Sequence, residues 1–181
     1  SIKDDVMEEV ARMYGYDNFE ATEFTTTFTD SINQKDKSLV RNIKEYLAIR
    51  CGMQEVYTYP WMNDVFVNAV LQSTDGVLKL STPPAPDMSC IRSSLLPNLC
   101  EAVAKNERYF NDFSIFEEAQ VFFDKNYTNA YDETESLPEQ RRHIGAAFAS
   151  SVKDIGMLFR EAKGVLEYMP RYTHMEAYEF K

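Results

Sequence analysis

The feature of this sequence that most limits its fold is an amphipathic helix joined by a glycine to a strand. Leu39, Ile43 and Leu47 recur at the four-residue interval of one helical face, with charged residues opposite. This stripe predicts a helix over residues 34–51. The Val-, Tyr- and Thr-rich segment that follows predicts a strand over residues 54–61. The helix needs an apolar surface to cover its stripe, and an adjoining sheet supplies one.

Helix and strand patterns intermix along the rest of the chain without the regular alternation of a doubly wound sheet. We therefore expect an α+β fold, with an antiparallel sheet flanked by helices. A composition shift at residues 18–23 predicts a domain boundary. Further helices are predicted over residues 4–14, 64–72, 94–108 and 156–169, strands over 77–81, 114–123, 143–149 and 172–180, an acidic loop over 124–139, and a linker or edge strand over 22–29.

Composition limits the class of protein. Hydrophobic residues make up 44% of the 181 residues, which is enough for a substantial core. The formal net charge of −10 argues against a free-standing nucleic-acid binder, because phosphate neutralisation needs clustered cations. No apolar run approaches the ~20 residues that span a bilayer. The three cysteines match no metal-binding spacing, so we expect free thiols in a reducing compartment and a cytoplasmic protein.

Motifs for catalysis or phosphate binding are absent from the sequence. Neither G-x-G-x-x-G nor G-x-x-x-x-G-K-[ST] occurs. The two histidines, His143 and His174, lie far apart with no arranged nucleophile nearby, and ligands for zinc are too few. Taken alone, the sequence offers no catalytic constellation.

One group of carboxylates stands out near the start of the chain. Asp5, Glu8 and Glu9 are spaced i, i+3 and i+4, so they share one face of the predicted helix over residues 4–14. An oxygen-seeking cation would reverse their mutual repulsion. The alternative is that acidic side chains are simply favoured near a helix N-terminus by the helix dipole and by solvent. Spacing alone leaves both interpretations open.

Five segments resemble, in the same order, the beta chain of bacterial phenylalanyl-tRNA synthetase. Residues 5–18, DVMEEVARMYGYDN, are similar to its DLxEEVARxYGYdnI signature, and Asn106 matches a downstream Asn of the family. The other similar segments are residues 52–59, GMQEVYTY (G-x-x-E-V-x-T-Y), 88–99, MSCIRSSLLPNL (xMRtSLLPgLL), 115–122, IFEEAQVF (lFEiGxvF), and 137–139, LPE (LPEe).

The resemblance implies two parts. Residues 1–20 correspond to the C-terminal helix of a preceding small domain with its linker, and residues 21–181 to an incomplete beta-chain core domain. In the family this core is a catalytically inactive copy of the class II aminoacyl-tRNA synthetase fold. Catalytic class II modules hold ATP with two features. One is an Arg in an FRxE-type strand, and the other is a glycine-rich segment that ends in a Glu-Arg pair. The strand at Phe116-Glu117-Glu118 lacks that Arg, so no catalytic residue is expected.

The resemblance also implies a magnesium site and the use of ATP. The family has a magnesium site shared with the alpha chain, and its ligands include carboxylates that match Asp5, Glu8 and Glu9. Another family ligand falls upstream of Ser1, so this chain carries an incomplete site. ATP is used by the whole enzyme, in which two alpha and two beta chains attach phenylalanine to its tRNA through an aminoacyl-adenylate.

The implied role of this chain is that of a structural and interface module. Its second helix and following strand resemble the class II dimerisation segment, so Leu39, Ile43 and Leu47 are expected to contact the alpha chain. Packing of the stripe on its own sheet is the alternative, and both uses can coexist. A function of a different class, an RNA-binding module that contacts the tRNA, is disfavoured by the net charge. The family usually has a longer stretch between Ala149 and Gly156, and its core normally continues past Lys181.

Overall fold

The computed structural model describes residues 2–29, 32, 34–70, 76–128 and 136–174. The chain divides into two compact units, residues 1–33 and 34–181. In the first unit, α1 spans Lys3–Tyr14 and the 3-10 helix η1 spans Tyr16–Asn18. Gly15 between them has a φ of +93°, a conformation that glycine adopts without strain. The helix predicted over residues 4–14 is confirmed, whereas residues 22–29 form no strand, which favours the linker interpretation.

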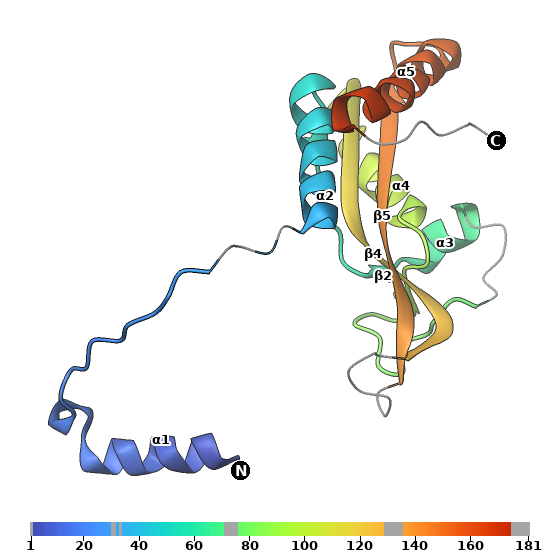
Figure 1. Cartoon of the computed structure of the whole chain (residues 1–181). Helices are drawn as coiled ribbons and strands as arrows, with labels where there is room; N and C mark the ends of the chain where they lie inside the picture. Colours follow the sequence, from blue (N-terminus) through green and yellow to red (C-terminus); the bar gives the residue numbers. More distant parts are fainter. Residues whose placement is uncertain (1, 30–31, 33, 71–75, 129–135, 175–181) are drawn as a thin grey trace. The chain divides into compact units, whose positions relative to one another are not determined.

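The second unit is built on a long β-hairpin (Figure 1). β4 (Asp112–Thr128) and β5 (Ser136–Ser150) pair antiparallel. The short strand β1 (Gln54–Glu55) lies parallel to β4 on its other side, which gives the order β1-β4-β5. The α+β fold is confirmed, and the parallel neighbour is an addition to the antiparallel pair.

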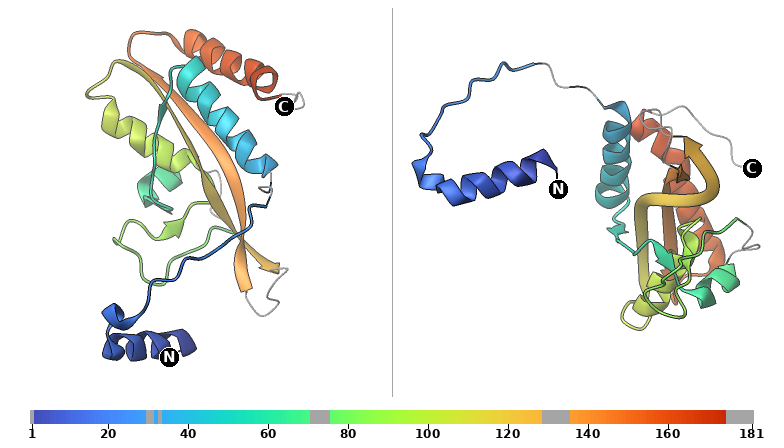
Figure 2. Two further views of the ribbon diagram at one scale, coloured as in Figure 1. Left: turned by 60° about the vertical axis from the view of Figure 1, so that its left-hand side comes forward. Right: turned by 90° about the horizontal axis from the view of Figure 1, so that it is seen from below.

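Helices cover both faces of the hairpin (Figure 2). On one face lie α2 (Lys35–Glu45), its π-helical continuation η2 (Tyr46–Arg50), and α5 (Ile155–Thr173); α4 (Leu96–Asn106) lies on the other. Alternate residues of a strand point to opposite faces, so Phe116 contributes to the first core and Ile115 to the second. Buried residues of the first core are Ile43, Tyr46, Leu47, Met53, Phe116 and Met169; those of the second are Leu95, Leu99, Ile115 and Val121.

A small ribbon precedes α4 in the sequence. β2 (Trp61–Met62) pairs antiparallel with β3 (Cys90–Ile91). Val67 of α3 (Asp64–Val70) packs with Met62 and Cys90 in a third, small core. Cys90 is buried there, whereas Cys51 and Cys100 are half-buried. All three cysteines are free, as predicted.

Several predicted segments differ from the structure. The strand predicted over residues 54–61 is interrupted, because only its two ends pair. The strand predicted over 77–81 is reduced to a bridge between Lys79 and Cys90. The loop predicted over 124–139 is wrong in its outer parts, which belong to β4 and β5. An antiparallel ladder is held by backbone groups, so it continues through the polar residues at the outer end of the hairpin.

The C-terminal helix also differs from the prediction. The strand expected over residues 172–180 is wrong at its start, since α5 continues through Pro170 to Thr173; residues 175–180 lie outside the described part. Tyr172 packs against Tyr46 with ring centroids 5.3 Å apart, and the Thr173 hydroxyl donates to the Met169 carbonyl at 2.8 Å. Within the described ranges no helix, α5 included, is long and apolar enough to cross a membrane.

Gly145 of β5 allows α4 to approach the sheet closely. A Cβ atom at this position would lie 2.8 Å from Leu99 Cδ1 and 3.2 Å from Leu95 Cβ, both on the α4 side. The tip of the Leu99 side chain can move, but the position of Leu95 Cβ is fixed by the backbone at the start of α4. The second core therefore depends on the absence of a side chain at position 145.

We expect Gly145→Val to lower the free energy of unfolding by about 1–3 kcal/mol, because it overpacks the contact between α4 and β5. Urea unfolding of the 181-residue chain measures this change. The matched control is Gly164→Ala in α5, where a Cβ meets nothing within 4 Å. This change should instead stabilise the helix by about 0.5–1 kcal/mol. Equal stability of the Gly145→Val variant and the wild type would contradict the close packing.

Candidate functional site

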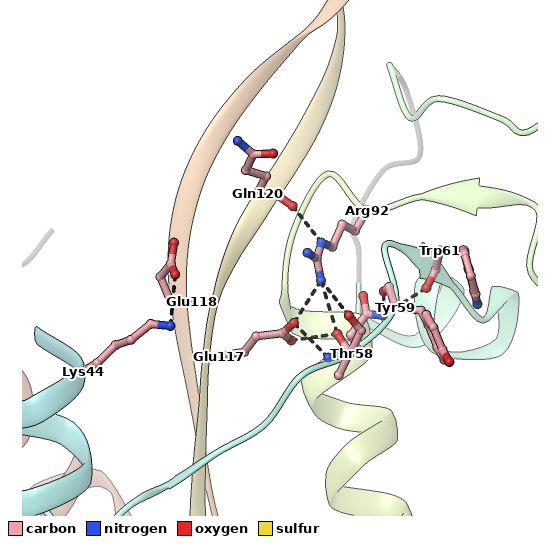
Figure 3. Close-up of polar contacts among 9 residues, drawn as sticks. Lys44, Thr58, Tyr59, Trp61, Arg92, Glu117, Glu118 and Gln120 are labelled. Atoms are coloured by element: carbon pink, nitrogen blue, oxygen red, sulfur yellow. Dashed lines mark hydrogen bonds and ion pairs between the residues drawn. The ribbon is translucent and has the colours of Figure 1, made fainter. Parts of the chain in front are cut away.

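A buried ion pair lies on the α4 face of the hairpin (Figure 3). Glu117 of β4 is 1% exposed, and Arg92, which follows β3, is 7% exposed. Arg92 Nη1 lies 3.0 Å from Glu117 Oε1. A residue pair of this kind is rarely buried unless every polar atom finds a partner, so the surrounding hydrogen bonds decide what the pair can do.

Thr58, in the segment between β1 and β2, completes the coordination of the carboxylate. Its backbone N–H donates to Glu117 Oε1 at 3.0 Å, and its hydroxyl donates to Glu117 Oε2 at 2.7 Å. Both oxygens of Glu117 are thus occupied by donors from this chain. A buried carboxylate in this state has little capacity to act as a base or to accept a ligand.

Arg92 is held through both its side chain and its backbone. Its Nε donates to the Gln120 carbonyl at 2.7 Å, and its own backbone carbonyl accepts from Phe122 N at 2.9 Å. Its backbone N–H donates to the Pro60 carbonyl at 2.8 Å. The guanidinium joins β4 to the segment before β2, and it is already paired with a carboxylate where a phosphate would otherwise bind.

Asn98 of α4 fixes the same segment from the other side. Its Nδ2 donates to the carbonyls of Tyr59 at 3.1 Å and Trp61 at 3.0 Å. These two aromatic rings stack with centroids 4.5 Å apart and an interplanar angle of 9°. The segment over residues 58–61 is therefore held by side chains rather than by a continuous strand ladder.

The face of the hairpin that α2 covers carries a second, more exposed network of ion pairs. Lys44 of α2 lies 2.6 Å from Glu55 Oε1 and 3.3 Å from Glu118 Oε2, and Arg142 of β5 lies 3.1 Å from Glu118 Oε1. Partial burial lowers the pKa of Lys44, but the hydrogen bonds to Glu55 and Glu118 outweigh it, so the pKa lies above its ordinary value. The network links α2 to all three strands of the order β1-β4-β5.

The predicted metal ligands lie on α1 in the first unit. Asp5 Oδ2 accepts from the backbone N–H of Ile2 at 3.1 Å, and Glu9 Oε2 pairs with Arg12 at 2.7 Å. Among the described residues no group of three or more His, Cys, Asp or Glu side chains is arranged to hold a metal ion. The carboxylates are suitable oxygen ligands, yet a site built on them needs donors from elsewhere.

The predicted interface stripe lies in the first core of the second unit. Ile43 is 5% exposed and Leu47 is 1% exposed, and both contact the core that contains Phe116; Leu39 is half-buried against it. The stripe therefore packs on its own sheet. Contact with an alpha chain stays a prediction, for which Leu39 retains the most accessible surface of the three.

The buried pair was not predicted from the sequence. Arg92 and Glu117 are separated by 25 residues, and neither spacing nor periodicity links them. A weak signal is that each charged residue directly follows a short apolar segment, Cys90-Ile91 before Arg92 and Ile115-Phe116 before Glu117. Two opposite charges in such positions are typical of a buried pair.

Solved structures that resemble this chain include aminoacyl-tRNA synthetases. A pyrrolysyl-tRNA synthetase from Desulfitobacterium hafniense superposes with a TM-score of 0.60 at 14% identity, over 79% of this chain and 48% of that one. A prolyl-tRNA synthetase from Giardia lamblia, in complex with prolyl-adenylate, gives 0.53 at 10% identity, over 75% and 28%. At these identities the likeness concerns the fold, which is that of the class II aminoacyl-tRNA synthetases.

Sequence comparison narrows the class to one family. Residues 20–181 match the family described as phenylalanyl tRNA synthetase beta chain CLM domain. The phenylalanine–tRNA ligase beta subunit of Carboxydothermus hydrogenoformans is 34% identical over 80% of this chain and 18% of its own length. That of Clostridium tetani is 26% identical over 99% of this chain and 22% of its own length. The chain belongs to the phenylalanine–tRNA ligase beta subunit family, and it spans about a fifth of these relatives' length.

We expect Arg92→Met to lower the free energy of unfolding by about 3–5 kcal/mol, because it leaves the Glu117 carboxylate buried without its cation. Removing both charges, in the variant Arg92→Met with Glu117→Leu, should restore a large part of that loss. Urea unfolding of the two single variants and the double variant gives the coupling energy.

The exposed pair Arg41–Glu45 is the matched control, with side chains 79% and 41% exposed. Arg41→Met should cost less than about 1 kcal/mol. Losses of the same size at positions 41 and 92 would contradict the assignment of a buried, mutually dependent pair.

Proposed function

We propose that this chain is a structural and interface module of the beta subunit, which supports the attachment of phenylalanine to its tRNA by the alpha subunit with ATP. By itself the module is non-catalytic. The observation that carries this proposal is the buried Arg92–Glu117 pair. In catalytic class II modules the corresponding strand holds an ATP-binding Arg, whereas here it holds Glu117. Both carboxylate oxygens of Glu117 already accept hydrogen bonds from this chain's own donors.

The electrostatics of the α4 face support a non-catalytic role. Stabilising the transferring groups of ATP needs cations that are free and aimed at the phosphates. Arg92, the buried cation of this face, is committed to Glu117 and to the Gln120 carbonyl. The nearby Lys105 is 2.7 Å from Glu101 on the same helix. Neither cation is available to a triphosphate without breaking an existing ion pair.

We expect no phenylalanine-dependent exchange of pyrophosphate into ATP from the pure 181-residue chain, since the buried cation of its α4 face, Arg92, is already paired with Glu117. The assay is run beside a complete complex of alpha and beta subunits, which should be active. Measurable exchange by the pure chain alone would falsify the non-catalytic proposal.

The interface part of the proposal concerns α2. Leu39 combines contact with the first core and remaining exposure, so it can reach a partner without leaving its own sheet. We expect Leu39→Ala to weaken binding of the alpha chain about tenfold, a loss on the order of 1.4 kcal/mol, as measured by sedimentation or titration calorimetry. Val65→Ala, which removes an exposed apolar side chain from α3, is the control and should leave the affinity unchanged.

The metal part of the proposal concerns α1. Asp5, Glu8 and Glu9 would contribute carboxylates to a Mg²⁺ site that the alpha chain completes, and the cation would relieve the repulsion along the helix face. Titration calorimetry of the alpha–beta complex should show weaker Mg²⁺ binding in the Glu8→Gln variant than in the wild type. The control is Glu20→Gln, outside α1. The module acts in the cytoplasm, where free thiols such as Cys90 persist.

The other candidate, an RNA-binding module, remains a testable outcome. A net charge of −10 disfavours broad contact with a phosphate backbone. Binding of tRNA by the 181-residue chain at micromolar concentration, with a steep dependence on salt, would favour that function over the structural one.

A further inference from the structure

A cavity lies between the ends of η2 and α5, on the side of the unit away from the Arg92–Glu117 pair. Its volume is about 490 Å³, within the ~300–1,000 Å³ that small-molecule sites occupy. The lining residues are Tyr46, Arg50, Cys51, Tyr168, Arg171 and Tyr172. Two arginines and three tyrosines thus converge on one cavity of an otherwise acidic chain.

Neither arginine of the cavity pairs with a carboxylate in the described part of the chain. Arg41, Arg92 and Arg142 by contrast each form an ion pair with a glutamate. The guanidinium carbon of Arg50 lies 5.6 Å from the Tyr172 ring centroid, and that of Arg171 lies 5.8 Å from the Tyr168 centroid. Both cations lie over aromatic rings, and toward the residues that the structure describes their hydrogen-bond donors stay available.

We propose that this cavity binds a nucleotide, with Arg50 and Arg171 on the phosphate and the tyrosine rings against the base. Guanidinium groups bind phosphate oxygens in a bidentate manner, and aromatic rings stack on bases of any sequence. The ligand is either a free nucleotide or one nucleotide of an RNA strand, because both present the same chemistry. The inference goes beyond the proposed structural role and does not depend on an alpha chain.

The first test titrates the 181-residue chain with AMP and, separately, with a single-stranded oligouridylate that carries a 5′-phosphate. We expect saturable binding of at least one probe. AMP binding alone identifies the free nucleotide as the source, and oligouridylate binding without AMP binding identifies the RNA strand. Arg171→Gln should raise the dissociation constant about tenfold.

The matched control is Arg108→Gln. Arg108 also lies over a tyrosine ring, 4.7 Å from the Tyr109 centroid, and it has no carboxylate partner in the described part, but it does not line the cavity. The dissociation constant of this variant should stay within about twofold of the wild type. Thermal unfolding of both variants shows that the fold is retained.

The second test uses the cavity's own thiol as a reporter. Cys51 lines the cavity and is half-buried, and Cys100 of α4 is half-buried elsewhere. A bound nucleotide should slow alkylation of Cys51 by iodoacetamide and leave the rate at Cys100 unchanged, as read by mass spectrometry of the peptides.

Three results overturn the proposal. The first is the absence of saturable binding of either probe while Arg171→Gln lowers the melting temperature, which would mean that the arginines only offset the negative ends of η2 and α5. The second is an equal loss of affinity in Arg171→Gln and Arg108→Gln. The third is displacement of both probes by polyglutamate at equal charge concentration, which would identify a site for acidic peptides.

Discussion

The α4 face of the second unit is organised around one buried ion pair. Arg92 and Glu117 are brought out of water together, and desolvation of that kind is offset only when the geometry is good and the remaining donors and acceptors are satisfied. Thr58 supplies two of the hydrogen bonds on the carboxylate, and the Gln120 carbonyl accepts from Arg92 Nε. The pair therefore does more than neutralise charge. It places the segment between β1 and β2 against β4, although that segment has few strand hydrogen bonds of its own.

Adjacent carboxylates on β4 serve opposite faces of the hairpin. Glu117 points towards α4 and is almost fully buried, while Glu118 points towards α2 and meets Lys44 and Arg142 in a partly exposed network. Because successive side chains of a strand alternate in direction, two neighbouring residues tie the strand to two different layers. Both faces of the hairpin thus use acidic residues that are paired with this chain's own cations. This arrangement is the physical basis of the proposal that the chain has a supporting role rather than a catalytic one.

The parts of the fold that local patterns determine were predictable, and the long-range parts were not. The stripe at Leu39, Ile43 and Leu47 predicted α2 with its core, and the period of the central segments predicted β4 and β5. The extension of the hairpin to Thr128 and Ser136 was missed because backbone pairing, not side-chain pattern, sustains it. The ending of α5 was missed because Tyr172 is held by Tyr46, which is distant in the sequence. The same limit applies to Arg92 and Glu117, whose partnership is a property of the fold. The resemblance of short motifs identified the family, while the placement of Asp5, Glu8 and Glu9 at a metal site remains a prediction.

The contact between Gly145 and Leu99 has a consequence for how this protein can change over generations. The space between β5 and α4 admits a hydrogen atom at position 145 but not a methyl group. A larger residue there must displace the tip of Leu99 and also crowds Leu95 Cβ, which the backbone fixes. A shortened Leu99, in turn, opens a void unless the strand gains bulk. Positions 99 and 145 are therefore epistatic, and a single substitution that enlarges residue 145 or shortens Leu99 passes through a less stable intermediate.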